Sequence, residues 1–149
     1  EEDPMALKFP SVDFFRELAR RMNGDRATFE KLGFCDAVMG VRVLGKAPHL
    51  YALTFEVYDC TEVRELGDAS EAELDFTLQA PAELWREMLE SIRQHGQPAP
   101  QYTLNSLSHI GDRMQVVYED PEGHDKLYRF MATIQAYFDN ARDLEIEWA

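Results

Sequence analysis

The stretch HLYALTFEVY, residues His49–Tyr58, carries the clearest structural signal in this chain. Large apolar side chains occupy every second position of the stretch, at Tyr51, Leu53, Phe55 and Val57. Successive side chains of a β-strand point to opposite faces, so this alternation predicts a strand with one face buried in a core. The remaining strands are expected to assemble around it.

Similar but shorter patterns predict strands over residues 36–44, 62–66 and 72–78. Short connections containing Gly, Pro or Asp separate these segments. Because strands that follow one another closely usually pair, the first four strands are predicted to form an antiparallel meander. A fifth strand is predicted after Gly111. The residues that face one way in it are Met114, Val116 and Tyr118.

Apolar residues spaced three and four positions apart predict helices in the rest of the chain. The predicted helices span residues 11–22, 27–32, 81–95, 102–109 and 125–142. Ser11 is the expected N-cap of the first helix, and Gly96 the expected end of the third. The tail 144–149 alternates again and is expected either to dock as an edge strand or to stay loose. These elements predict an α+β fold, a five-stranded, mostly antiparallel sheet covered by helices.

A length of 149 residues suits one domain with a sizeable core. Residues 11–149 are expected to form that domain. Residues 1–10 are expected to be a disordered tail or residues added by cloning. The two cysteines, Cys35 and Cys60, do not make a disulfide framework, and reduced thiols fit a cytoplasmic protein.

The chain is strongly acidic, with 28 Asp and Glu against 15 Lys and Arg and a formal net charge of −13. The electrostatic field of so negative a chain repels phosphate groups, which argues against nucleic-acid binding. No run of about 18 apolar residues occurs, so stable membrane insertion is not expected.

Motifs for catalysis are scarce. The chain has no phosphate-binding glycine loop, no nucleophile elbow and no zinc-protease helix motif. Its four histidines, His49, His95, His109 and His124, are scattered over predicted turns and helix ends, where capping or solvation explains them. No Cys and His spacing resembles a metal site. We therefore expect a protein without catalytic residues, metal or cofactor.

The predicted helices instead carry many large, deformable apolar side chains. These are Phe14, Phe15, Met22, Trp85, Met88, Phe130, Met131 and Phe138. Methionine and aromatic rings adapt to irregular ligands, so they suit an apolar binding pocket. They also suit an ordinary core packed over a sheet, and periodicity alone does not separate the two interpretations.

Four short segments resemble the lipid-binding domain of sterol carrier proteins. They are LDFTL at 74–78, ELWREML at 83–89, LNSL at 104–107 and GDRMQV at 111–116. With the predicted order of elements, the resemblance covers residues 12–142. It implies an apolar tunnel between sheet and helices. It also implies non-enzymatic carriage of a fatty acyl chain, a sterol or a similar lipid, without a cofactor.

The resemblance also implies, by position, which side chains line the tunnel. The expected ligand-binding residues are Trp85, Met88, Leu89, Ile92, Leu104, Leu107, Met114, Val116, Met131, Ile134 and Phe138. A tunnel enclosed by these helices has no opening, so the last helix would have to shift to admit a ligand.

Two alternatives remain open at this stage. The last predicted helix is longer than is usual in the family, so it could plug the tunnel or serve as a homodimer face. The first alternative is therefore an interaction module of the same fold with a filled core. The second is a small enzyme that acts on an apolar substrate, with Asp75, Tyr128 or Gln135 as the candidate polar group. The C-terminal residues Glu147-Trp148-Ala149 do not form a peroxisomal signal.

Overall fold

The computed structural model describes residues 6–109 and 113–149. Its centre is a five-stranded sheet with the strand order β4-β3-β2-β5-β6. The strands are β2 (Ala37–Leu44), β3 (His49–Glu56), β4 (Asp59–Leu66), β5 (Phe76–Pro81) and β6 (Gln115–Val117). The pairs β2–β3, β3–β4 and β5–β6 are antiparallel. The predicted fold class, an α+β protein with a mostly antiparallel sheet covered by helices, is confirmed.

The predicted four-strand meander is wrong at its last strand. β5 does not pair with β4 but lies parallel to β2, in a register that aligns Met39 with Phe76. The connection from β4 to β5 packs on the outer face of the sheet, where it forms a second, small apolar core. The side chains of this core are Leu50, Ala52, Leu66, Ala72 and Leu74. Burying these side chains favours the crossing over the shorter turn that a meander needs.

Six α-helices accompany the sheet in the described part of the chain. They are α1 (Val12–Asn23), α2 (Arg26–Leu32), α3 (Ala82–His95), α4 (Leu104–His109), α5 (Pro121–Arg129) and α6 (Met131–Asp139). The Oγ of Ser11 accepts a hydrogen bond from the Phe14 amide at 3.0 Å, as its predicted N-cap role requires. Gly96 ends α3 in the left-handed conformation, which confirms its predicted role as well.

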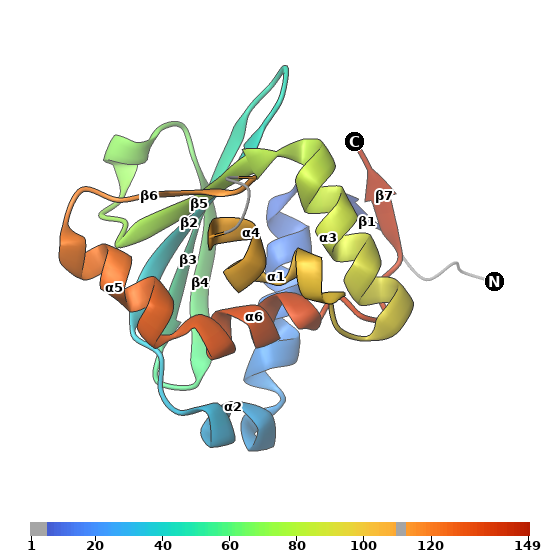
Figure 1. The fold of residues 1–149 in the computed structure, drawn as a ribbon, viewed down its shortest axis with the longest axis horizontal. Helices are drawn as coiled ribbons and strands as arrows, with labels where there is room; N and C mark the ends of the chain where they lie inside the picture. The colour runs from blue at the N-terminus through green and yellow to red at the C-terminus, as the bar shows by residue number, and fades with distance from the viewer. Residues whose placement is uncertain (1–5, 110–112) are drawn as a thin grey trace.

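The long last helix predicted over residues 125–142 is wrong, because the segment forms two helices that meet at a bend (Figure 1). Phe130 stands at the bend with a non-helical backbone, φ −109° and ψ 17°. α5 packs beside β5, whereas α6 packs against α1, α3 and α4. The apolar stripe continues through the bend because Phe130 is itself buried. Periodicity therefore could not reveal the break.

The two ends of the domain pair with each other. β1 (Leu7–Phe9) lies parallel to β7 (Ile146–Trp148) in a separate two-stranded sheet. β1 thus lies before the predicted domain boundary at residue 10. The C-terminal strand pairs with β1 and not with the main sheet. The ring of Phe9 holds this pair on the domain, 4.9 Å from the ring of Phe14 and 5.6 Å from that of Trp148.

The main core lies between one face of the sheet and the helices α1, α3, α4 and α6 (Figure 1). α5 stands at the side of the sheet, beside β5 and β6, and therefore closes one end of this layer (Figure 1). In the described residues, no helix has both the length and the apolar character needed to cross a membrane.

Candidate functional site

The predicted ligand-binding residues come together in space. Nine of them are buried in the main core, at 1% exposure or less: Trp85, Met88, Leu89, Ile92, Leu104, Leu107, Met114, Ile134 and Phe138. The other two, Val116 and Met131, are partly buried and pack against the same cluster. Three helices, α3, α4 and α6, together with β6 and its approach, therefore contribute to one apolar region.

The structure does not show a tunnel among these side chains. Five of them have no accessible surface at all, namely Trp85, Met88, Leu89, Ile92 and Ile134. A side chain without accessible surface touches no space that holds a water molecule. The rings of Trp85 and Phe138 lie 5.7 Å apart, which places α3 and α6 in direct contact. In this conformation the side chains of the helices pack directly against the sheet.

Hydrogen bonds fix the orientation of the larger buried side chains. The indole Nε1 of Trp85 donates to the carbonyl oxygen of Arg42 at 3.2 Å, which ties α3 to β2. The hydroxyl of Tyr137 donates to the carbonyl oxygen of Phe15 at 2.7 Å, which ties α6 to α1. The helices over the core are thus held by polar contacts as well as by packing.

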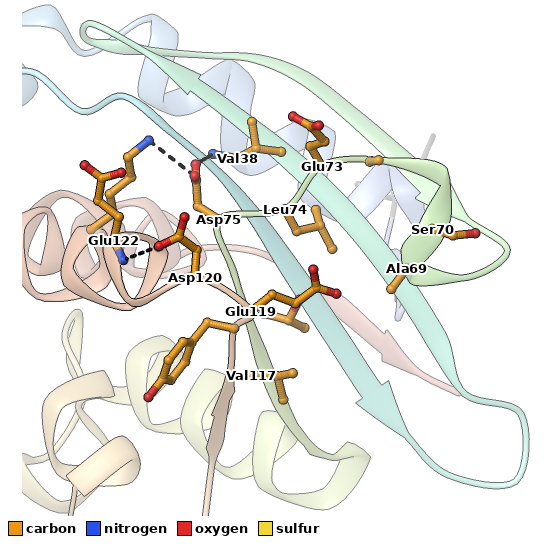
Figure 2. Close-up of a pocket in the computed structure, with 15 residues that line it drawn as sticks. Val38, Ala69, Ser70, Glu73, Leu74, Asp75, Val117, Glu119, Asp120 and Glu122 are labelled. Carbon is orange, nitrogen blue, oxygen red and sulfur yellow. Dashed lines mark hydrogen bonds and ion pairs between the residues drawn. The ribbon is translucent and has the colours of Figure 1, made fainter.

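Three of the hollows on the surface of the described residues are considered next, and these three do not lie directly beneath α3 or α6. The first, of about 630 Å³, is drawn in Figure 2. It lies between the β4–β5 connection and the loop that joins β6 to α5. The second is a groove of about 640 Å³ between β6, α4 and α5. The third, of about 420 Å³, lies between α1 and β4.

Asp75 lines the first hollow and contacts residues from two other segments (Figure 2). Its carboxylate accepts a hydrogen bond from the Val38 amide at 2.8 Å and pairs with the ammonium group of Lys126 at 3.3 Å. Gly123 brings α5 against the same residue, because a Cβ at Gly123 would collide with the carbonyl oxygen of Asp75. Asp75 therefore attaches α5 to the start of β5, and this role is structural.

The groove is where the predicted lining residues reach the surface. Met114 and Val116 line it from β6 and its approach. Its aromatic side chains, Tyr118, His124 and Tyr128, come from the loop after β6 and from α5. We name this site the β6–α5 groove, and eight of the described residues line it. Its lining residues are Ser108, Met114, Gln115, Val116, Val117, Tyr118, His124 and Tyr128.

Sequence reasoning missed the aromatic side of this groove. The ring of His124 lies 4.5 Å from that of Tyr118 and 4.9 Å from that of Tyr128. The spacing of four residues between His124 and Tyr128 places both rings on one face of a helix, and this was the available signal. The prediction of a helix that starts only at Asp125 left His124 outside it. The interpretation of His124 as a simple turn residue is incomplete.

The residues considered for catalysis have other roles in the structure. The side-chain oxygen of Gln135 accepts from the Leu104 amide at 2.8 Å, and its nitrogen donates to Asp139 at 3.0 Å. Burial raises the pKa of the Asp139 carboxyl, an effect that this hydrogen bond opposes. Tyr128 is exposed at the groove.

Both cysteine thiols lie in the buried core of the described structure. Burial raises the pKa of both thiols, Cys35 and Cys60, to about 12, so they stay protonated at neutral pH. Among residues 6–109 and 113–149, no group of three or more His, Cys, Asp or Glu side chains is placed to hold a metal ion.

The apolar face of α6 points inward. Phe138 is 1% exposed and Ile134 is fully buried, so neither is available to a second copy of the chain. The homodimer face expected on the last helix is therefore not formed by these two side chains. Met131 is partly buried and packs against the core as well.

No protein-family model matches this chain, and no curated protein matches it by sequence. Three solved structures match it by fold. A crystal structure of sterol carrier protein 2 matches with a TM-score of 0.65 at 16% identity, over 90% of this chain and 97% of the other. A conserved hypothetical protein from Thermus thermophilus, described as a candidate sterol carrier protein, matches with a TM-score of 0.69 at 16% identity, over 99% and 96%.

A third structure, sterol carrier protein 2 from Yarrowia lipolytica in its apo form, matches with a TM-score of 0.51 at 12% identity, over 89% of both chains. The similarity spans about nine tenths or more of each protein. At this level of identity it describes the fold. This chain has the sterol carrier protein 2 fold.

Proposed function

We propose that this protein binds an apolar, lipid-like ligand and carries it in the cytoplasm without changing it chemically. The ligand class is a fatty acyl chain, a sterol or a similar molecule. It occupies the region beneath α3, α4 and α6, among the eleven residues predicted to line a tunnel. Their side chains move apart to admit it, and the β6–α5 groove is the place of access.

The observation that carries the proposal is the continuity between the groove and the core. Met114 lines the groove but is 1% exposed and belongs to the main core cluster. Beyond it the region is apolar, because no charged side chain is buried among the residues that the structure describes. A ligand that enters past Met114 and Val116 meets mainly apolar side chains of the core cluster. The buried polar side chains on α3 and α6 are Ser91 and Thr133. The sterol carrier fold supports the same conclusion.

The energetics permit a ligand to open a packed core. Each methylene removed from water contributes about 0.8 kcal/mol, so a chain of about a dozen carbons offers about 10 kcal/mol. Immobilising the ligand and repacking the side chains around it consume part of this amount. Methionine repacks readily because it is unbranched and polarisable, and Met88, Met114 and Met131 all lie in the proposed region.

α5 is the element best placed to move during uptake. Its contacts with β5 include the ion pair between Lys126 and Asp75, whose side chains are 29% and 27% exposed. Such a pair contributes about 1 kcal/mol or less. α5 places one large side chain, Leu127, in the core, whereas α6 places three there, Ile134, Tyr137 and Phe138. The Lys126→Met substitution removes this attachment. We expect it to speed uptake of a fluorescent fatty acid in stopped-flow measurements, while Lys31→Met on α2 leaves the rate unchanged.

The experiment that tests the proposal uses energy transfer from Trp85. The chain has two tryptophans, so Trp148→Phe leaves Trp85 as the single donor. A polyene fatty acid that absorbs at the emission wavelength of tryptophan is titrated into this variant. Binding beside α3 quenches Trp85 in a saturable way. Sterols and polycyclic compounds are then tested by displacement of the polyene acid.

A matched pair of substitutions locates the site of access. Val116→Phe places a ring in the β6–α5 groove, and Thr61→Phe places one in the third hollow, on an exposed position of β4. We expect Val116→Phe to raise the dissociation constant about tenfold, which corresponds to about 1.4 kcal/mol. Thr61→Phe should bind as the parent does. The proposal fails if no acyl chain, sterol or polycyclic compound binds saturably to the parent protein.

A further inference from the structure

Among the described residues, the lining of the β6–α5 groove includes no Lys or Arg side chain that would recognise a carboxylate. The nearest basic residue on β6's approach, Arg113, already pairs with Glu87 at 2.9 Å. Anions bind where Arg, Lys or clustered backbone amides neutralise them. The head group of a fatty acid would therefore find no counter-charge in this groove.

The hollow beside the groove makes the surroundings of the site acidic. It shares Val117 and Tyr118 with the groove, so the two are adjacent. Five acidic residues line it, Glu73, Asp75, Glu119, Asp120 and Glu122, against the single cation Lys126. Lys126 is itself paired with Asp75. With a net charge of −13 over the whole chain, the field at the groove attracts cations and repels anions.

The aromatic rings supply the short-range contacts that a cation needs. Tyr118 and Tyr128 are 45% and 37% exposed and flank His124 along the groove. The faces of tyrosine rings carry negative electrostatic potential, and they bind quaternary ammonium groups that cannot donate hydrogen bonds. A groove wall with two exposed tyrosine rings, and with no Lys or Arg among its described lining residues, therefore fits a methylated ammonium group better than a carboxylate or a phosphate.

We infer that the β6–α5 groove selects ligands with a cationic head group, in the form of a single-chain amphiphile that ends in a quaternary ammonium. The ammonium lies against Tyr118 and Tyr128, and the alkyl chain passes Met114 into the core. This inference rests on the proposed function, because the chain of the amphiphile uses the same apolar region. It adds the chemical class of the ligand.

The test compares three amphiphiles that share one alkyl chain. Dodecyltrimethylammonium, dodecanoate and dodecanol are titrated, each below its critical micelle concentration, by displacement of the polyene fatty acid. We expect the ammonium compound to bind at least about tenfold more tightly than dodecanoate. In Tyr118→Leu and Tyr128→Leu, each lost ring should weaken the ammonium compound about three- to fivefold and leave dodecanol unchanged. Tyr58→Leu, on the β3–β4 hairpin, is the matched control and should change nothing.

The outcomes separate the inference from the proposed function. If dodecanoate binds as tightly as the ammonium compound, the inference is wrong, while carriage of an apolar ligand stands. If the ammonium compound binds tightly but the two tyrosine variants keep the full preference, the assigned groove is wrong. If none of the three amphiphiles displaces the polyene acid, the inference is wrong, and the proposed function is then decided by the titrations of the polyene acid, the sterols and the polycyclic compounds. A second readout, the ring-proton shifts of both tyrosines on addition of tetramethylammonium chloride, reports the head group alone.

Discussion

Replacing Gly123 with alanine tests how closely α5 approaches the sheet. In a helix, alanine is favoured over glycine by about 1 kcal/mol, so propensity alone predicts that Gly123→Ala stabilises the protein. The structure predicts the opposite, because the added Cβ would collide with the backbone carbonyl of Asp75. A backbone atom at the start of a strand cannot rotate away as a flexible side chain would.

The size of the effect follows from these two contributions. Overpacking of this kind costs about 1–3 kcal/mol or more, and it outweighs the gain in propensity, which is smaller in the first turn of a helix. We expect a net loss of about 1–2 kcal/mol in the free energy of unfolding. For a domain of this size, that lowers Tm by about 3–6 °C.

Urea and thermal unfolding followed by far-UV circular dichroism measure this loss. Gly24→Ala is the matched control, because a Cβ there would lie 3.5 Å from the carbonyl oxygen of Arg20, an ordinary contact. Gly24 also has a φ of −90°, which alanine adopts without strain. The control should stay within about 0.5 kcal/mol of the parent. A Gly123→Ala protein as stable as the parent would refute the close approach of α5 to β5.

Two further predictions concern α1. Tyr137→Phe removes the buried hydrogen bond to the Phe15 carbonyl oxygen and should cost about 1 kcal/mol in urea unfolding; an unchanged midpoint would contradict that bond. Hydrogen bonds from Arg20 and Arg21 lower the pKa of Glu17 from 4.5 to about 2 in the folded protein. Because the pKa of Glu17 is lower in the folded protein than in the unfolded chain, the ionised carboxylate stabilises the folded state. This stabilisation is fully present above pH 4.5 and is lost as the pH falls toward 2. Glu17→Gln should therefore flatten the acid side of the stability profile, and profiles of equal slope would contradict the assignment.

The sequence predicted the elements with a strong repeating pattern. The alternation over His49–Tyr58 gave β3, and the apolar stripe over residues 81–95 gave α3 within one residue. The sequence could not predict that β5 pairs with β2, because alternation defines the two faces of a strand and not the strand beside it. The three residues of β1 are too few for any periodic signal, and only their pairing with β7 makes them a strand.

The sequence predicted that the expected ligand-binding side chains gather in one apolar region, but not whether they enclose a space. The spacing of Trp85, Met88 and Ile92 on one helix face indicated that they meet the sheet. Whether such side chains enclose a space or fill it depends on differences of a few ångströms between helices, which the sequence pattern does not encode. The aromatic side of the groove was missed for a different reason. It forms only when the loop after β6 folds back on α5, so that Tyr118 contacts His124.

The parallel pairing of β1 with β7 determines how the domain responds to mechanical force. The amide of Leu7 donates to the carbonyl oxygen of Glu145 at 2.9 Å, and the amide of Ala149 donates to that of Phe9 at 3.0 Å. β1 lies near the N-terminus and β7 near the C-terminus, and the two strands run in the same direction. A force that pulls the two termini apart therefore acts on opposite ends of the ribbon. The bonds between them are then sheared together instead of being unzipped one at a time. This small ribbon is therefore a clamp that must break before tension reaches the core.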